Sequence, residues 1–217
     1  MRYSEIYTII DNSDSIRSGI TECCKALGRE MKHPFFEELF SCDYAADLAS
    51  MREWIMRCLR AEPPALAITA LLFSISTSST DEEAVLIEGE DMEFLDAIAK
   101  GLAYPYVSMY GSKDFDGNPN VGFKDYDPGD GCKLDGLTQI VSASVSHGEK
   151  LFELIDCYFV IAYIGLLLNA TMQDLDPSLV LGKKQRRSVF VCYSEAEDVH
   201  LLGEITKKGW QKSREGR

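Results

Sequence analysis

Hydrophobic positions in the first third of the chain recur at the spacing of α-helices. One apolar stripe runs from Ile16 to Leu27, and Gly28 is placed to end that helix. A second stripe runs from Tyr44 to Leu59, with Asp43 as its candidate N-cap and a proline pair beginning at Pro63 after it. We therefore predict that the N-terminal third is helical.

The pattern then changes to that of β-strands. The segment Ala65–Thr77 is rich in β-branched and apolar residues and predicts a central strand, although a buried helix starting at Pro64 remains an alternative. The polar stretch that follows it predicts a turn, and Ala84–Glu88 a returning strand. Tyr104–Tyr110 is expected to be a short strand near an edge, because Pro105 cannot donate to a central ladder.

The second half repeats this alternation of helical and extended patterns. Helices are expected over Met92–Leu102 with Asp91 as the cap, over Leu134–Val145 and over Leu151–Met172. The segments SVFVCYS (188–194) and VHLLGEIT (199–206), around a short acidic turn, predict a β-hairpin.

The order of these elements favours one fold class. We expect a single α+β domain over residues 1–217, in which helices pack on an antiparallel sheet of about four to five strands. The basic tail 207–217 is expected to be frayed, and GKKQRR (182–187) to be a basic turn on the surface.

Charge is concentrated in one part of the chain. The formal net charge is −13 over 217 residues, and residues 81–135 hold 14 acids against 4 Lys and no Arg, a net charge of −10. This asymmetry disfavours nucleic acid and anionic lipid as partners and favours a cationic one. A solvated face that keeps the protein soluble is the alternative.

Residues 111–131 form the longest predicted loop, and alternating oxygen ligands in it suggest a calcium site. Asp114, Asp116, Asn118 and Asn120 alternate, but an EF-hand starting at Asp114 would have Pro119 at its sixth position. Turns are also built from these residue types. We therefore predict no metal and no cofactor, and keep a calcium-binding module or a divalent-cation-dependent enzyme that uses loop 111–131 as the alternative.

Motifs of catalysis are missing from the sequence. His33, His147 and His200 lie far apart, and there is no GxSxG segment and no complete phosphate loop before Lys183. Seven cysteines without CxxC spacing predict reduced, structural thiols. We expect a protein that binds rather than one that catalyses.

Membrane insertion and secretion are not expected. The N-terminus lacks a long apolar run with a cleavage site, and the most apolar segment, Cys157–Leu168, is too short to span a bilayer. Reduced cysteines favour a cytoplasmic location.

The hairpin SVFVCYSEAEDVHLLGEITKKGW and the segment ALAITALLFSIS after a helical start give the chain a family resemblance. Their layout resembles that of small acidic bacterial immunity proteins, which are paired with polymorphic or secreted toxins. The resemblance implies a protein without chemistry of its own that neutralises one cognate toxin by occluding its basic active site. It implies neither nucleic acid nor a membrane as a partner, and it leaves the oligomeric state open.

The acid-rich region supplies the candidate binding residues. Its carboxylates are expected to meet a cationic partner and its aromatics to anchor that partner. The alternative for the aromatics is that they fold back onto the core. The predicted partner-binding residues are Glu88, Glu90, Asp91, Asp114, Phe115, Asp116, Phe123, Asp125, Tyr126, Asp127 and Asp130.

Overall fold

A computed structural model describes residues 1–41, 43–79, 91–100, 103–113, 124–126, 131–193 and 199–213. The helices in these ranges are α1 (Tyr3–Asn12), α2 (Ile16–Glu30), α3 (Phe35–Glu38), the 3-10 turn η1 (Leu39–Ser41), α4 (Tyr44–Ala61), α6 (Asp91–Ala99), α7 (Asp135–Val145), α8 (Glu149–Leu154), the π-helical turn η2 (Ile155–Phe159), α9 (Val160–Asp174) and α10 (Pro177–Leu181). The strands are β1 (Ala70–Ser79), β2 (Ala103–Ser112), β3 (Lys124–Asp125), β4 (Cys132–Lys133), β5 (Arg186–Tyr193), β6 (Val199–Thr206) and β7 (Gly209–Lys212). The α+β class is confirmed.

The strands form one sheet, and its topology corrects the prediction of an antiparallel one. Six strands follow the order β3-β2-β1-β5-β6-β7, and the two-residue β4 pairs with β2 beside this path. Neighbours are antiparallel except β1 and β5, which run parallel from Ala70 opposite Ser188 to Ile75 opposite Tyr193. The sheet is therefore mixed.

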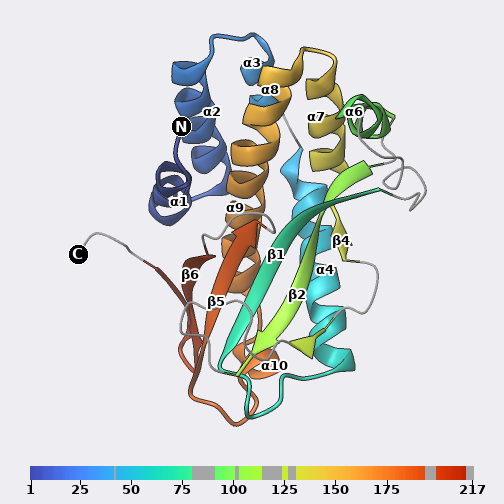
Figure 1. Ribbon diagram of the computed structural model, residues 1–217. Helices are drawn as coiled ribbons and strands as arrows, with labels where there is room; N and C mark the ends of the chain where they lie inside the picture. The colour runs from blue at the N-terminus through green and yellow to red at the C-terminus, as the bar shows by residue number, and fades with distance from the viewer. Residues whose placement is uncertain are drawn as a thin grey trace.

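The parallel pair follows from the long connection between its strands. Antiparallel neighbours need only a tight turn, whereas parallel strands need a crossover. After β2 the chain passes through α7, α8, α9 and α10 before it returns as β5 (Figure 1). This path brings β5 back beside β1 in the same direction.

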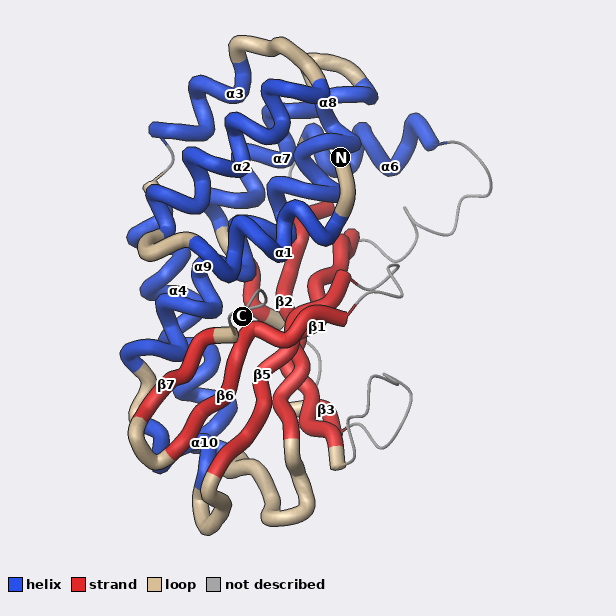
Figure 2. The backbone as a smooth tube through the Cα atoms, turned by 90° about the vertical axis from the view of Figure 1, so that its left-hand side faces the viewer, coloured by secondary structure: helices blue, strands red, loops and turns tan. Residues whose placement is uncertain are grey.

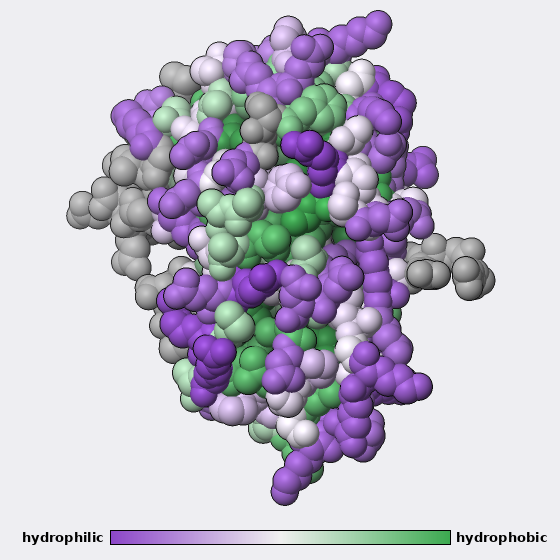
Figure 3. Space-filling view, turned by 180° about the vertical axis from the view of Figure 1, so that it is seen from behind, coloured by the Kyte–Doolittle hydropathy of each residue, from purple (hydrophilic) through white to green (hydrophobic). Residues whose placement is uncertain are grey.

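Helices cover one face of the sheet. In Figures 1 and 2 the strands lie on one side of the molecule, and α4, α7 and α9 lie behind them. Side chains alternate accordingly, so that Phe73 and Ile75 of β1 and Val107 and Met109 of β2 are fully buried. Phe73 meets Trp54 of α4 edge-on, with ring centroids 6.4 Å apart. Figure 3 shows this helical side from behind, with hydrophilic side chains around hydrophobic ones at its centre.

The predicted apolar stripes are confirmed as the buried faces of α2 and α4. Asp43 caps α4 as expected, accepting a hydrogen bond from the Ala45 N–H at 3.0 Å. The expectation that Gly28 ends the first helix is wrong, because α2 continues to Glu30. Gly28 lies within this helix, where a Cβ would meet no atom within 4 Å. The turn before α3 buries Phe35 and Phe36, as predicted.

The helix Glu149–Asp174 runs through the centre of the molecule. It joins α8, η2 and α9, and by length and composition it is the one helix in the described ranges that is apolar enough to cross a bilayer. Of its most apolar 18-residue window, 78% is buried in this structure, and the core helix of a soluble protein passes the same test. α9 contacts α1, α2 and α4 on one side and β5, β6 and β7 on the other, which makes it the centre of the core.

The predicted strands agree with the structure only in part. Ala70–Ser79 is a strand, so the alternative of a helix from Pro64 is wrong, and the hairpin of β5 and β6 is confirmed. β2 lies near an edge as expected, next to the two-residue β3, but it is ten residues long rather than short, and Pro105 pairs with Thr77 of β1. The tail is not frayed through Lys212, because Gly209–Lys212 adds β7 to β6. The expected strand 84–88 lies outside the described residues.

Candidate functional site

Most of the predicted partner-binding residues lie outside the part of the chain that the structure describes. For Asp91 and Asp125 the structure gives the backbone alone, at the start of α6 and in β3. Those outside the described residues are Glu88, Glu90, Asp114, Phe115, Asp116, Phe123, Asp127 and Asp130. The binding role of these residues stays a prediction.

Tyr126 is the one predicted binding residue whose side chain is described, and it is buried. Its ring packs closely against Gly111. A Cβ added at Gly111 would stand 2.6 Å from a carbon of this ring. Burial raises the pKa of its hydroxyl, and the nearby Arg187 guanidinium opposes that rise. For this aromatic the structure shows the alternative, a side chain folded onto the core.

Arg187 corrects the prediction of a surface turn at 182–187. Its side chain is 1% exposed. Its Nη2 donates to the main-chain carbonyls of Pro64 and Ala65, each at 2.9 Å. Burial lowers the pKa of this guanidinium. Arg187 therefore ties the start of β5 to the segment that leaves α4, and it is not part of a basic surface.

The side of the sheet that faces away from the helices carries tyrosine and serine. We call the Tyr/Ser face the partly exposed residues Ser74 and Ser76 of β1 and Tyr104, Tyr106, Ser108 and Tyr110 of β2. The register places Ser74 opposite Ser108 and Ser76 opposite Tyr106, so these side chains share one surface. The Lys133 ammonium of β4 lies 4.2 Å from the centroid of the Tyr104 ring.

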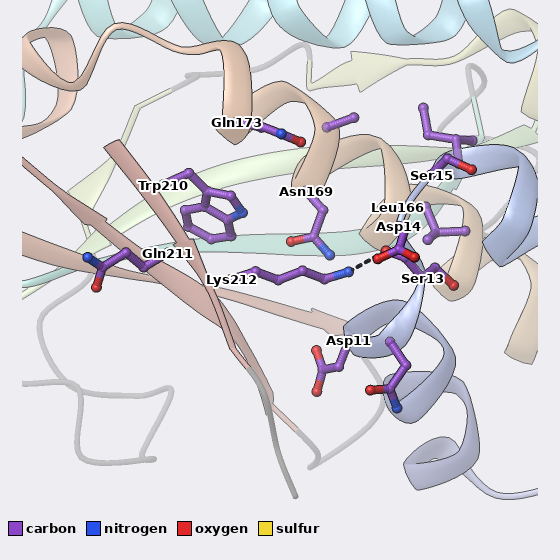
Figure 4. A pocket seen from close by; sticks show the side chains of 13 residues that line it. Asp11, Ser13, Asp14, Ser15, Leu166, Asn169, Gln173, Trp210, Gln211 and Lys212 are labelled. Carbon is purple, nitrogen blue, oxygen red and sulfur yellow. Dashed lines mark hydrogen bonds between the residues drawn. The ribbon is translucent and has the colours of Figure 1, made fainter. Parts of the chain in front are cut away.

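A polar groove lies at the other end of the sheet. It occupies about 840 Å³ between the turn that joins α1 to α2, the second half of α9, and β7 (Figure 4). Its polar lining includes Asp14, Asn169, Gln173, Gln211 and Lys212, and Trp210 and Leu166 add apolar surface. Figure 4 shows the Asn169 side chain projecting from α9 toward Trp210 and Lys212. We call this cavity the α9–β7 groove.

Asp11, which also lines the α9–β7 groove, belongs to a buried carboxyl–imidazole pair. Its Oδ1 lies 3.0 Å from the Nε2 of His200 in β6, and both side chains are almost fully buried. The ring of Tyr7 stacks on the His200 ring, with centroids 4.2 Å apart and planes at 4°. The imidazole is thus held on two sides, which is the arrangement of a structural histidine rather than of a general base open to substrate.

Lys212 closes part of the groove. Its ammonium donates to the main-chain carbonyl of Ser13 at 2.8 Å, which joins β7 to the end of α1. Asn169 is 8% exposed, and neither its Oδ1 nor its Nδ2 has a hydrogen-bond partner among the residues that the structure describes. The indole Nε1 of Trp210 is buried and unpaired in the same way.

Metal-ligating and redox groups do not gather in the described ranges. No group of three or more His, Cys, Asp or Glu in them is placed to hold a metal ion. The six described cysteines form no disulfide, and all but Cys157 are buried. Burial raises the pKa of Cys24 from 9.0 to about 12, so this thiol stays protonated and unreactive.

A search with this chain against protein-family models, curated proteins and solved structures found no match. No relative therefore tests the resemblance to immunity proteins.

Sequence reasoning did not find the α9–β7 groove. Asn169 and Trp210 come from segments that were interpreted as a core helix and as a frayed tail. The one available signal was a carboxamide inside the apolar run LLLNAT, because an amide in such a run needs a hydrogen-bonding partner.

Proposed function

We propose that this protein is a binding domain without chemistry of its own that captures a basic protein partner. In the form that the family resemblance implies, the partner is a bacterial toxin domain, the protein is its immunity partner, and the complex forms in the cytoplasm. The observation that carries the proposal is the Tyr/Ser face, which draws four of its six residues from the acid-rich region 81–135 of the sequence.

The composition of the Tyr/Ser face is that of surfaces which bind proteins. Tyrosine offers a large, rigid contact area at a low cost in side-chain entropy, and serine adds adaptable hydrogen bonds. Three tyrosines and three serines share this face of two neighbouring strands. Large rings standing side by side on a sheet suit the centre of an interface, from which water is excluded.

The charge of the neighbouring elements indicates the kind of partner. β2 belongs to the acid-rich region 81–135. Apart from the start of α7, the other described elements of this region are α6, β3 and β4, and all three contact β2. The acids of α6 and β3, namely Asp91, Glu93, Asp96 and Asp125, therefore belong to elements at the end of the sheet that bears the Tyr/Ser face. A basic surface would be drawn to it at long range and then packed on the tyrosines.

Affinity purification from the native cell, with this chain as bait, tests the proposal. We expect a basic protein to co-purify and to be lost when Asp114, Asp116, Asp125, Asp127 and Asp130 are changed to Lys. The matched control reverses five exposed acids elsewhere on the helices and their ends: Glu37, Glu53, Glu62, Glu149 and Glu153. Both variants change the net charge equally, so a difference between them reports the location of the charge.

Tyr106→Ala tests the Tyr/Ser face separately. Its loss from the centre of an interface is expected to weaken binding by about 2 kcal/mol or more. The weakening of binding caused by reversing the acids should shrink steeply as salt is added. The weakening caused by Tyr106→Ala should not depend on salt in this way. Equal capture by the wild type and by both the acid-reversed and the Tyr106→Ala variants would refute the proposal.

A further inference from the structure

The α9–β7 groove holds polar atoms whose hydrogen bonds are missing. Both amide atoms of Asn169 and the Nε1 of Trp210 are buried without a partner in the described part of the chain. Such groups have lost their bonds to water and gained none in return, which is unfavourable. Most buried polar side chains in native proteins do have partners, so two unpaired side chains in one groove point to a partner that comes from outside the chain.

The amide of Asn169 restricts the chemistry of that partner. An anion would satisfy its Nδ2 alone, and a metal cation would satisfy its Oδ1 alone. A partner for both atoms must accept and donate at adjacent positions, as neighbouring hydroxyl groups do. The Trp210 indole N–H needs an acceptor, and a hydroxyl oxygen supplies that as well.

The remaining lining of the groove favours an uncharged ligand. Asp14 and Lys212 carry opposite charges, and Gln173 and Gln211 add carboxamides that donate and accept. Leu166 and the Trp210 ring give apolar surface, which suits the C–H face of a sugar ring. The volume of about 840 Å³ lies within the range of small-molecule sites, about 300–1,000 Å³. We propose that the α9–β7 groove binds a saccharide of one or two rings.

Figure 4 shows Lys212 beside the Asn169 amide. The amide atoms are covered from solvent, so binding requires a local opening, and movement of the ammonium away from the Ser13 carbonyl would supply one. β7 is four residues long, and β6 is its only neighbour among the described strands. Local opening there costs less than opening the core. Breaking the Lys212–Ser13 hydrogen bond is therefore a step that would open the site to a ligand.

The groove and the Tyr/Ser face are independent sites. β7 and β2 lie toward opposite ends of the sheet order, with β1, β5 and β6 between them. Saccharide binding therefore does not depend on the capture of a protein partner.

Saturation-transfer NMR on the full chain tests the site. The probes are D-glucose, D-galactose, D-mannose, N-acetyl-D-glucosamine and maltose, and N-acetylglycine amide serves as a minimal peptide. We expect transfer to at least one saccharide and at least about a tenfold loss of affinity in Asn169→Leu, which keeps the branched shape of the side chain but removes both amide atoms. Gln139→Leu, an exposed carboxamide on α7 outside the groove, is the matched control and should bind like the wild type.

Thermal melting of Asn169→Leu separates ligand binding from a structural role. If the amide is unsatisfied in the free protein, its removal leaves the melting temperature unchanged or raises it. A clear fall in melting temperature would show that the amide is already bonded, and it would overturn the proposal. Equal saccharide affinity in Asn169→Leu, transfer to N-acetylglycine amide alone, or no transfer to any probe would also overturn it.

Discussion

Asp47 is a buried carboxylate that joins three elements, and its removal should be among the most destabilising substitutions. It lies on α4, and its oxygens accept from the main-chain N–H groups of Gly136 and Leu137 at 3.0 and 2.9 Å and from the Tyr163 hydroxyl at 2.9 Å. It thus caps the start of α7 from a neighbouring helix and binds α9 at the same point. Asp47→Ala removes the acceptor of all three donors, of which the Leu137 N–H and the Tyr163 hydroxyl are buried and the Gly136 N–H is partly buried.

The structure sets the magnitude of this effect. Each buried donor left unsatisfied costs about 1–3 kcal/mol, and the three costs overlap, so we expect a total of about 3–5 kcal/mol. A domain is stable by about 5–15 kcal/mol, so the variant should unfold at a much lower urea concentration. Circular dichroism during urea titration measures the change, and an unaltered slope would show that the loss lies in the folded state.

Two further variants check the reasoning. Asp43→Ala removes an exposed cap from α4 and should cost only about 1 kcal/mol. Tyr163→Phe removes one of the three donors, so it should cost about 1 kcal/mol in the wild type and less in Asp47→Ala. If Asp47→Ala is no more destabilising than Asp43→Ala, the three hydrogen bonds do not stabilise the fold as argued.

Three other predictions concern packing, thiols and ions. Gly165→Ala should destabilise the protein by about 1–3 kcal/mol in a chemical melt, although alanine favours helices, because the added Cβ would stand 2.6 Å from the buried Ile10 Cδ1. Unchanged stability would contradict this close approach of α1 and α9. Cys24 should resist Ellman's reagent at pH 8 until the chain unfolds, and its contribution to stability, complete below the unfolded pKa of 9.0, should be lost as pH rises toward about 12. Rapid labelling of the native thiol would contradict its burial. Millimolar calcium or magnesium should leave the melting temperature unchanged, and a rise that grows with ion concentration would favour the alternative of a cation site in loop 111–131.

The helices could be predicted because their signal is local. The stripes from Ile16 to Leu27 and from Tyr44 to Leu59 repeat at the helical period, and Asp43 stands where a cap is needed. Gly28 shows the limit of such rules. Glycine often ends a helix, but Gly28 lies inside α2, whose C-cap is Met31. Intrinsic preference decides a helix end only where packing leaves it free.

The arrangement of the sheet could not be predicted in the same way. Whether β1 and β5 run parallel depends on how four intervening helices pack, and no local pattern carries that information. The α9–β7 groove could not be predicted for the same reason, because its residues come from α1, α9 and β7 and meet only in the folded chain. The predicted binding acids were inferred from charge, which indicates a kind of partner but not a position.

The parallel pairing of β1 with β5 also bears on synthesis of the chain. Leu72 and Phe190 are neighbours in the sheet but more than a hundred residues apart in sequence, so the centre of the sheet closes only after β5 has left the ribosome. Until then β1 presents an unpaired edge and α9 lacks its cover of strands, which exposes apolar surface during translation. A truncation that removes residues 186–217 would therefore take away β5, β6 and β7, half of the strand order, rather than a single edge strand.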